Sequence, residues 1–271
     1  MTAADTEADG PLSRLSKAAL CSAATLDVDD VQTMFDHLYN FNSIALTSQW
    51  LERIPDSEAV RGALGLDAAA TASDELSTRW SQAPDGTDKN WSFWVRPGAG
   101  GDLRRSETGL KLYVSPAVDA LSSVFPEVAR VATYARADCI KVGAHVAGLL
   151  RPDKLVVYFS SMEDLVNAAH GLERRLEGAP AHGVPFTAEI STDGLLSWAR
   201  DPPRHWSISE GAETSWREWI CLRSAHALVD SRNQADNPEA CCQLALTRLR
   251  AEGVDTDRWS PKPALWGRRR W

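Results

Sequence analysis

The stretch Leu155-Val-Val-Tyr-Phe159 decides the fold, because an unbroken run of apolar and aromatic residues is typical of a buried β-strand. Two other stretches have a similar character. Trp91-Ser-Phe-Trp-Val95 alternates along the chain, and Leu110-Lys-Leu-Tyr-Val114 is followed by Pro116, which ends it. Cys139-Ile-Lys-Val142 is a shorter strand of the same kind. The chain from residue 91 onward is therefore expected to form a sheet.

Helical segments separate these strands. Residues 117–136 form a predicted helix, and the sequence Ser161-Met-Glu-Asp164 resembles a capping box that starts a helix to about Glu177. Residues 184–190 suit an edge strand, because Pro185 cannot donate a ladder hydrogen bond. Strands interleaved with helices favour an α+β fold with a mixed or antiparallel sheet flanked by helices. Two later helices are expected over residues 216–230 and 239–251.

The N-terminal region is predicted to be helical. Between Asp29 and Leu51 the apolar residues recur at helical spacing, and Asp29 or Asp30 is suited to cap the helix. Shorter helices are expected over residues 57–66 and 73–80. This region contains no recognisable catalytic motif.

Charge is distributed unevenly along the chain. The first 100 residues carry 7 basic and 15 acidic side chains, and the remainder carries 22 of each, for a net charge of −8. We therefore predict a disordered tail over residues 1–12, a helical region over 13–90 and an α+β domain over 91–271. A chain with this balance is not expected to bind nucleic acid through its overall charge.

Nothing in the sequence predicts a membrane span, a metal or a disulfide framework. The chain has no apolar run of bilayer-spanning length and begins without a signal-peptide pattern, so a cytoplasmic protein is expected. Its five cysteines include no C-x-x-C pair, and its six histidines lack metal-ligand spacing. Cys221, Cys241 and Cys242 fall in helical patterns and are expected to be buried small hydrophobic residues. No cofactor is expected.

Basic side chains on strand-like segments are the candidates for chemistry. Lys111 and Tyr113 lie two residues apart in one strand and therefore share a face. Taken singly, each such cation is expected to be an ordinary surface residue whose apolar stem packs on the protein. Periodicity alone does not bring the candidates together, and Asp153 is expected to be a salt-bridge or turn residue. The other candidates are Lys141, Arg151, Lys154, Tyr158 and Arg217.

An ordered series of short motifs connects these residues. The series resembles the HopA family of type III effector-like proteins over about residues 91–230. Proteins of this kind also occur in bacterial gene clusters for modified peptides, including class V lanthipeptide and thioviridamide-like pathways, where they are associated with dehydration of Ser and Thr. The fifth motif is expected to be a structural turn. The motifs are Gly109-Leu-Lys-Leu-Tyr-Val-Ser115, Ile140-Lys-Val-Gly143, Leu149-Leu-Arg-Pro-Asp-Lys154, Gly183-Val-Pro-Phe-Thr187, Gly194-Leu-Leu-Ser-Trp198 with Asp201-Pro-Pro203, and Ser215-Trp-Arg217.

A more distant similarity to phosphothreonine lyases implies roles for the same positions. In that family a Gly-x-Lys-Phe-His strand carries the general acid, and Tyr113 stands where the His would be. Lys141 stands at the position of the family's catalytic base. The family's strand ending in Leu-Tyr matches Tyr158, and its phosphate-binding Ser-Tyr-Arg resembles the motif that ends in Arg217. Arg151 is the nearest candidate for the second phosphate-binding arginine.

The resemblance implies β-elimination without a cofactor. A neutral lysine, Lys141, removes the Cα proton, and neighbouring cations both bind the phosphate and disfavour the charged form of this base. Lys111 or Lys154 stabilises the developing enolate, and Tyr113 or Tyr158 supplies a proton to the leaving phosphate. Tyrosine is a weaker acid than imidazolium but stays protonated at neutral pH. Phe186 is a candidate for contact with the substrate, with packing in the core as the favoured alternative.

The leading prediction is a lyase that eliminates phosphate from phosphoserine or phosphothreonine in a precursor peptide, giving dehydroalanine or dehydrobutyrine. A separate kinase would phosphorylate that peptide, because no nucleotide-binding motif is present. The acidic N-terminal region is a candidate docking surface for the kinase or the peptide leader. The alternative is a non-catalytic, effector-like interaction module that retains a relic phosphate pocket. Neither nucleic acid nor membrane is an expected partner.

Overall fold

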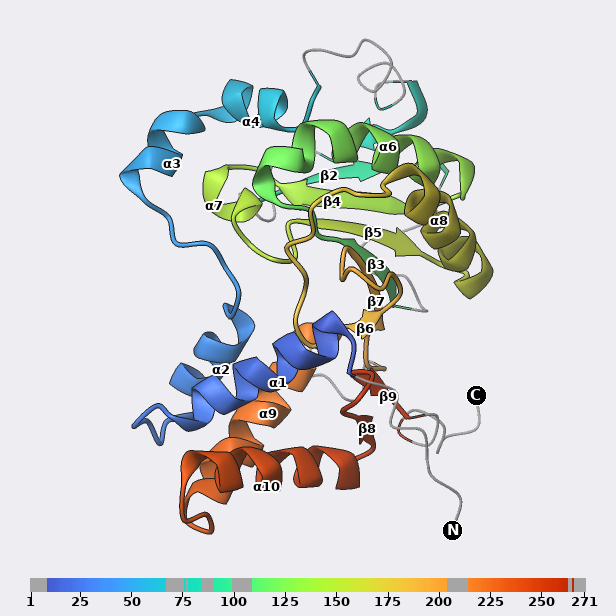
Figure 1. Ribbon diagram of the computed structural model, residues 1–271. Helices are drawn as coiled ribbons and strands as arrows, with labels where there is room; N and C mark the ends of the chain where they lie inside the picture. Colours follow the sequence, from blue (N-terminus) through green and yellow to red (C-terminus); the bar gives the residue numbers. More distant parts are fainter. Residues whose placement is uncertain are drawn as a thin grey trace.

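A computed structural model describes residues 9–66, 76, 78–83, 90–98, 109–203, 214–262 and 265. Within these residues, seven strands form one antiparallel sheet in the order β1-β2-β4-β5-β3-β7-β6 (Figure 1). A small hairpin of β8 and β9 lies apart from it. The strands are β1 (Ser81–Gln82), β2 (Trp91–Val95), β3 (Leu110–Val114), β4 (Cys139–Gly143), β5 (Leu155–Phe159), β6 (Ala188–Glu189), β7 (Leu196–Arg200), β8 (Val254–Asp255) and β9 (Ser260–Pro261).

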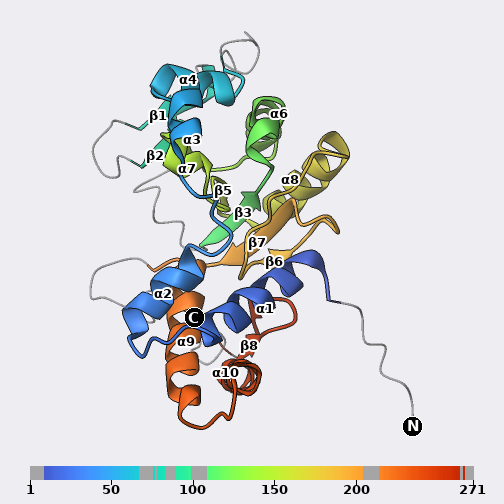
Figure 2. The ribbon, with the colours of Figure 1, turned by 60° about the vertical axis from the view of Figure 1, so that its left-hand side comes forward.

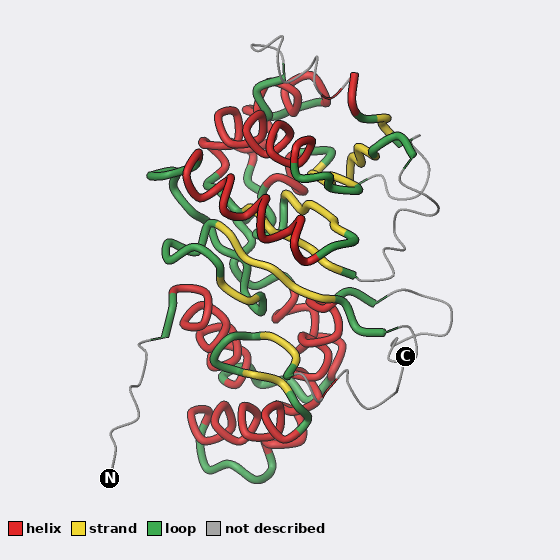
Figure 3. The backbone as a smooth tube through the Cα atoms, turned by 90° about the vertical axis from the view of Figure 1, so that its right-hand side faces the viewer, coloured by secondary structure: helices red, strands yellow, loops and turns green. Residues whose placement is uncertain are grey.

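The helices lie on the two sides of this sheet, which Figure 3 shows as a strand layer between two helical groups. On one side are α3, α4, α6 and α8, and on the other are α1, α2, α9 and α10. Their bounds are α1 (Pro11–Ala24), α2 (Val31–Tyr39), α3 (Ser48–Arg53), α4 (Ser57–Ala63), η1 (Val118–Ala120), α6 (Leu121–Tyr134), α7 (Val146–Leu149), α8 (Met162–Arg175), α9 (Trp216–Arg232) and α10 (Pro238–Ala251).

Each face of the sheet belongs to a different hydrophobic core, because successive side chains of a strand point to opposite faces. Leu112, Ile140 and Val157 point to the first core, where α6 and α8 cover them with residues such as Phe125 and Leu165. The helices α3 and α4 extend this core, since Ile54, Val60 and Leu64 are buried in it. The centre of this face is therefore apolar.

The second core joins segments from both ends of the sequence. Leu20 of α1 and Met34 and Leu38 of α2 are fully buried against α9 and α10, which contribute Ile220 and Leu246. Figure 2 shows these four helices together below the sheet. Tyr113, Val156 and Ala199 extend this core to the other face of the strands.

The predicted α+β class with an antiparallel sheet is confirmed. The strands predicted at 91–95, 110–114 and 155–159 have the same bounds in the structure, and β6 is an edge strand as expected, although it is shorter than predicted. The helix predicted from Asp29 to Leu51 is two helices, α2 and α3, separated at Asn42, whose φ is +66°. The expected turn at 194–198 is wrong at its C-terminal side, because Leu196–Arg200 is the paired strand β7.

The helices of residues 13–90 do not pack as a single unit. α1 and α2 belong to the second core, whereas α3 and α4 belong to the first. α1 begins at Pro11, inside the predicted tail, and half of the residues of the helix predicted over 73–80 lie outside the described residues. Among the described residues, none of the helices combines the length and apolar character that crossing a bilayer requires.

Candidate functional site

Four of the predicted residues share one face of three neighbouring strands. Lys111 of β3 lies directly opposite Tyr158 of β5. Val156 of β5 lies between Lys141 of β4 and Tyr113 of β3, opposite one on each side. Neighbouring strands are about 5 Å apart, so the backbones of Lys141 and Tyr113 are roughly 10 Å apart across the sheet. This face points away from α6 and α8, on the side where α9 begins (Figure 1).

Aromatic side chains of β2 surround Lys141. Its Nζ lies 3.8 Å from the centre of the Trp91 ring and 6.0 Å from that of Phe93. Phe93 is also its direct cross-strand partner. Such a contact attracts an ammonium group through the electron-rich face of the ring. Lys141 is partly exposed.

Asp153 holds two arginines at the edge of this face. Its carboxylate accepts two hydrogen bonds from Arg151, with distances of 2.8 and 3.1 Å, and one of 2.7 Å from Arg217. Burial raises the pKa of this carboxyl group, but Arg217 and then Arg151 outweigh burial and hold it well below its usual value. The expected salt-bridge role of Asp153 is therefore present, and it fixes one edge of each guanidinium group.

Arg217 is buried and engaged by the protein. Besides Asp153, it donates to the backbone oxygens of Tyr39, at 2.9 Å, and Pro185, at 3.4 Å. Burial disfavours its charge, but Asp153 and Tyr39 raise the pKa of Arg217 above its ordinary value. Only 1% of its side chain is exposed, so it supports Asp153 from behind. Arg151 is the exposed member of the pair, at 23%.

Tyr39 and Trp91 complete the surroundings of Arg151. The centre of its guanidinium group lies 5.1 Å from the Tyr39 ring and 5.5 Å from the Trp91 ring. Arg217 also lies 4.9 Å from the Tyr39 ring. Trp91 thus contacts both Lys141 and Arg151, and joins the strand face to the arginine pair. We call the group formed by Tyr39, Trp91, Lys111, Lys141, Arg151, Asp153, Tyr158, Asp201 and Arg217 the cationic cluster.

Lys111 is held by Asp201, which follows β7. Its Nζ lies 2.5 Å from the Asp201 carboxylate and 5.4 Å from the Tyr158 ring. The other oxygen of Asp201 accepts from the backbone N–H of Trp216, the first residue of α9, at 2.8 Å. Ser215 caps that helix in a reciprocal capping box with Glu218. Asp201 therefore connects Lys111 with the helix turn that carries Arg217.

The two tyrosines are kept protonated by their surroundings. Burial, and then the Asp201 carboxylate, raise the pKa of Tyr113 well above its usual value. Burial also raises the pKa of Tyr158, with a further contribution from Cys139. Tyr113 is buried at 3% exposure, whereas Tyr158 is partly exposed.

Lys154 lies away from the cluster, inside the protein. Its Nζ donates to the Pro116 carbonyl, at 3.1 Å, and to Nδ1 of His182, at 2.7 Å. The other ring nitrogen of His182 lies 2.6 Å from the carbonyl of Asn42, which can only accept. Burial lowers the pKa of Lys154 to about 7 and that of His182 to about 4. With no exposed surface, Lys154 cannot contact an enolate on a substrate.

Phe186 also lies outside the cluster. It is fully buried in the second core, where its ring packs edge-on against Trp259. Its N–H donates to the Ser16 hydroxyl and its carbonyl accepts from the indole of Trp216. Phe186 therefore links α1 to the start of α9 and offers no surface to a substrate.

Sequence reasoning missed Tyr39 and Trp91 as members of the cluster. The alternation of 91–95 indicated that Trp91 and Phe93 share a face, but not which strand they neighbour. Tyr39 has no such signal, because its helix reads only as amphipathic. Asp201 stood in a motif that was expected to be a structural turn, and its contact with Lys111 depends on tertiary packing.

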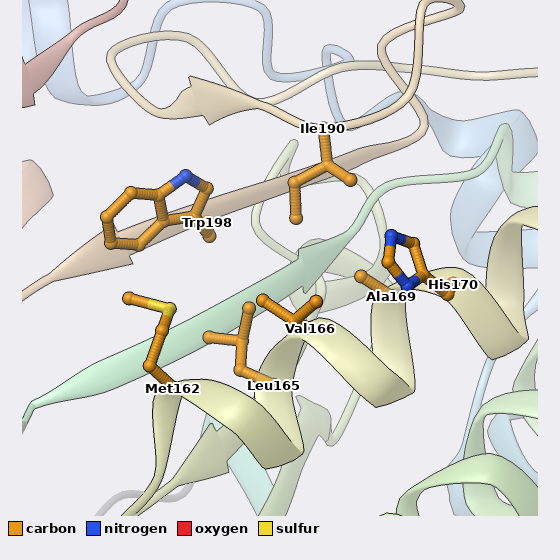
Figure 4. A pocket seen from close by; sticks show the side chains of 7 residues that line it. All are labelled: Met162, Leu165, Val166, Ala169, His170, Ile190 and Trp198. Atoms are coloured by element: carbon orange, nitrogen blue, oxygen red, sulfur yellow. The ribbon is translucent and has the colours of Figure 1, made fainter.

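The cluster can bind an anion and position a proton donor. Among its side chains, four basic groups face two carboxylates, which leaves an excess of positive charge when both lysines are protonated. The described residues contain no group of His, Cys, Asp and Glu suited to hold a metal ion. A different pocket of about 240 Å³ lies on the opposite face, between α8 and β7 (Figure 4). It is lined by apolar side chains and His170, so it does not share the chemistry of the cluster.

Comparison with known proteins gives distant structural likenesses. No family model matches the chain, and no curated protein matches it. An effector protein from Pseudomonas syringae pv. tomato strain DC3000 is 12% identical over 93% of this chain and 98% of its own, with a TM-score of 0.49. The type III effector and phosphothreonine lyase OspF from Shigella flexneri is 13% identical over 71% and 99%, with a TM-score of 0.39. The phosphothreonine lyase SpvC from Salmonella is 16% identical over 71% and 97%, with a TM-score of 0.38.

Proposed function

We propose that this chain is a lyase that β-eliminates phosphate from phosphoserine or phosphothreonine in a peptide. The observation that carries the proposal is the register of β4, β5 and β3, which sets Lys141, Tyr158 and Lys111 on one face beside Arg151. The reaction needs an anion site, a base and a proton donor within the span of one phosphorylated residue, and these side chains are of the required types.

Phosphate binding is assigned to Arg151, with help from the two lysines. A phosphate dianion is attracted by an excess of fixed positive charge, and arginine binds it through paired N–H donors. Asp153 already occupies two donors of Arg151, so the remaining edge of the guanidinium group is the part offered to the ligand. Arg217 acts indirectly in this proposal, by fixing Asp153.

Lys141 is the proposed base. It must be neutral to accept the Cα proton, and the positive charge of Arg151 beside the same Trp91 ring disfavours a second charge there. The contact with Trp91 acts in the opposite direction, because it favours the ammonium form. Trp91 therefore holds the amine in place in this proposal.

Tyr158 is the preferred proton donor, and Lys111 the preferred stabiliser of the enolate. Tyr158 stays protonated, is partly exposed and lies directly across from Lys111. Tyr113 is the second candidate for the acid, but its burial leaves it further from a bound peptide. Proton transfer to the leaving phosphate completes the elimination, and neither a metal nor an organic cofactor enters these steps.

The natural substrate of the proposal is a precursor peptide in a lanthipeptide-type pathway, phosphorylated by a separate kinase. This part rests on the motif series over residues 91–230. The acidic N-terminal region over residues 13–90 is the proposed docking site for that kinase or for the peptide leader. Replacing the exposed Glu52 and Glu58 with Lys should weaken binding of the kinase or leader at least tenfold in calorimetry. Unchanged affinity would contradict the docking site without touching the lyase assignment.

The test of the lyase is mass spectrometry of phosphoserine and phosphothreonine peptides incubated with the protein. We expect loss of phosphoric acid with the wild type and a loss of rate of at least a thousandfold with Lys141→Ala. Lys262→Ala removes an exposed lysine elsewhere and should eliminate phosphate at the wild-type rate.

The competing proposal is an interaction module that binds phosphate without chemistry. The buried Arg217 and the carboxylates already paired with Arg151 and Lys111 favour it, because they neutralise much of the cluster. Phosphopeptide binding without elimination, in the presence of the kinase and leader, would support the module. Elimination that is abolished by Lys141→Ala would exclude it.

A further inference from the structure

Two cysteines that are distant in sequence meet on the surface of the second core. Cys21 of α1 and Cys242 of α10 have their Sγ atoms 2.6 Å apart. Unbonded sulfur atoms do not ordinarily approach so closely, and a disulfide bond is only about 0.5 Å shorter. The two helices lie side by side in Figures 1 and 2. Spacing in the sequence gave no indication of this pair, because 221 positions separate the residues.

The other three cysteines differ from Cys21 in exposure, whereas Cys242 is buried as they are and burial raises the pKa of its thiol too. Cys139, Cys221 and Cys241 are buried, and burial raises the pKa of the Cys139 and Cys221 thiols to about 12. Cys241 points elsewhere, with its Sγ 3.6 Å from the Leu228 carbonyl. Cys21 is the exposed cysteine of the five. A reagent in solution can therefore reach Cys21, and Cys242 lies directly behind it.

We propose that Cys21 and Cys242 form a reversible modification site that reacts with small-molecule disulfides to give an intramolecular disulfide between α1 and α10. The Cys21 thiolate attacks the reagent disulfide and expels one thiolate, leaving a mixed disulfide on Cys21. Cys242 then loses its proton and attacks the Cys21 sulfur, and the second reagent thiolate leaves. Two protein thiols are oxidised, the reagent disulfide is reduced to two thiols, and atoms and electrons balance.

The bond would link the first described helix to the last. Cross-linking residues so far apart restricts the unfolded chain strongly, so the oxidised protein should unfold at a temperature about 10 °C higher. The site lies in the helical layer, and neither cysteine contacts the cationic cluster. The inference therefore does not depend on the proposed lyase activity.

The experiment is thiol counting after treatment with oxidised glutathione. Denatured protein is alkylated and digested, and the peptides are identified by mass. We expect three alkylated cysteines of the five, together with one cross-linked peptide pair containing Cys21 and Cys242 that has lost two hydrogen atoms. Dithiothreitol should restore five alkylated cysteines and remove the thermal shift.

Matched variants separate this outcome from others. Cys241→Ala removes the neighbouring thiol and should still form the Cys21–Cys242 bond and show the thermal shift. Cys21→Ser removes the exposed thiol of the pair, so little disturbance of the fold is expected. This variant should abolish both the disulfide bond and the thermal shift. A stable glutathione adduct on Cys21 with Cys242 still alkylated would overturn the proposal, as would pairing with Cys241 or a disulfide between two copies of the chain.

Discussion

A single carboxylate, Asp153, decides the geometry of the cationic cluster. It is 8% exposed and serves both Arg151 and Arg217. Removing one partner from a buried charge pair leaves the other charges without compensation, which costs far more than the pair itself contributes. The arginines were recognisable from their motifs, but their shared partner follows from the tertiary structure.

Asp153→Asn should lower the free energy of unfolding by about 3–5 kcal/mol in urea titration at neutral pH. The exposed pair of Asp230 and Arg248 gives the matched control, and Asp230→Asn should cost less than about 1 kcal/mol. Because the folded-state pKa of Asp153 is lowered, its contribution is present above the ordinary aspartate range and is lost as the pH falls through the folded pKa. Equal losses of unfolding free energy in Asp153→Asn and Asp230→Asn would contradict a special stabilising role of Asp153.

Lys154 gives a pH dependence of the same sign as Asp153, in a higher pH range. Its pKa is lowered to about 7 in the folded protein, so between pH 7 and its ordinary value the unfolded chain binds more protons. The free energy of unfolding should therefore rise from pH 7 to 8.5, by up to about 1.4 kcal/mol per pH unit. Lys154→Met should flatten this rise, and Lys262→Met at an exposed site should keep it. If the free energy of unfolding of Lys154→Met still rose with pH to the same extent, the rise would come from other titratable groups.

At the scale of elements, the first turn of α9 contains both the residues that cap the helix and a residue of the cationic cluster. Ser215 caps the helix, Trp216 donates to Asp201, and Arg217 follows at once. The sequence predicted a helix from residue 216, and in the structure Ser and Glu three residues apart form its capping box. It did not predict that Asp201, on the far side of an undescribed stretch, would meet the same turn.

Ser215→Ala should lower the free energy of unfolding by about 1 kcal/mol and also weaken phosphopeptide binding, since the turn that holds Arg217 loosens. Asp56 caps α4, far from the cluster, and its side chain accepts from the Ala59 N–H in the same manner. Asp56→Ala should cost a similar amount of stability, measured in urea, and leave binding unchanged. Loss of binding in both variants would point to general destabilisation.

The order of strands in the sheet shows what sequence reasoning can and cannot reach. The runs at 91–95, 110–114 and 155–159 are apolar enough to be recognised singly. Which strands pair is not recognisable, because the order in the sheet differs from the order in the chain. β3 lies between β5 and β7, and β4 and β5 separate it from β2. The cationic cluster depends on which strands are neighbours. Its basic and aromatic residues could therefore be predicted from the sequence, but their proximity in space could not.

At the scale of the molecule, one sheet supports two hydrophobic cores. The predicted boundary near residue 90 separates α1 and α2 from helices with which they share a core. Helical periodicity predicts that each of these helices has a buried apolar face, but not which other helix covers it. It therefore does not predict the contacts between residues 11–39 and 216–259. The chain is thus less divisible than its charge distribution suggested.

Leu20→Ala tests this integration. Leu20 is fully buried in the second core, so the substitution should cost about 2–5 kcal/mol. Tryptophan fluorescence and far-ultraviolet circular dichroism should still report one coincident urea transition, because the sheet belongs to both cores. Leu51 is 49% exposed, and Leu51→Ala should change the stability by less than about 0.5 kcal/mol. Two separated transitions in Leu20→Ala would mean that the cores unfold independently.

The meeting of α1 with α9 and α10 has a consequence for synthesis on the ribosome. The apolar faces of α1 and α2 emerge early, but the helices that cover them are translated only about 200 residues later. At elongation rates of roughly 5–20 residues per second, those faces stay uncovered for about ten seconds or more. During that interval the nascent chain is a natural client for holding chaperones, whereas the strands from β2 to β5 can already pair with one another.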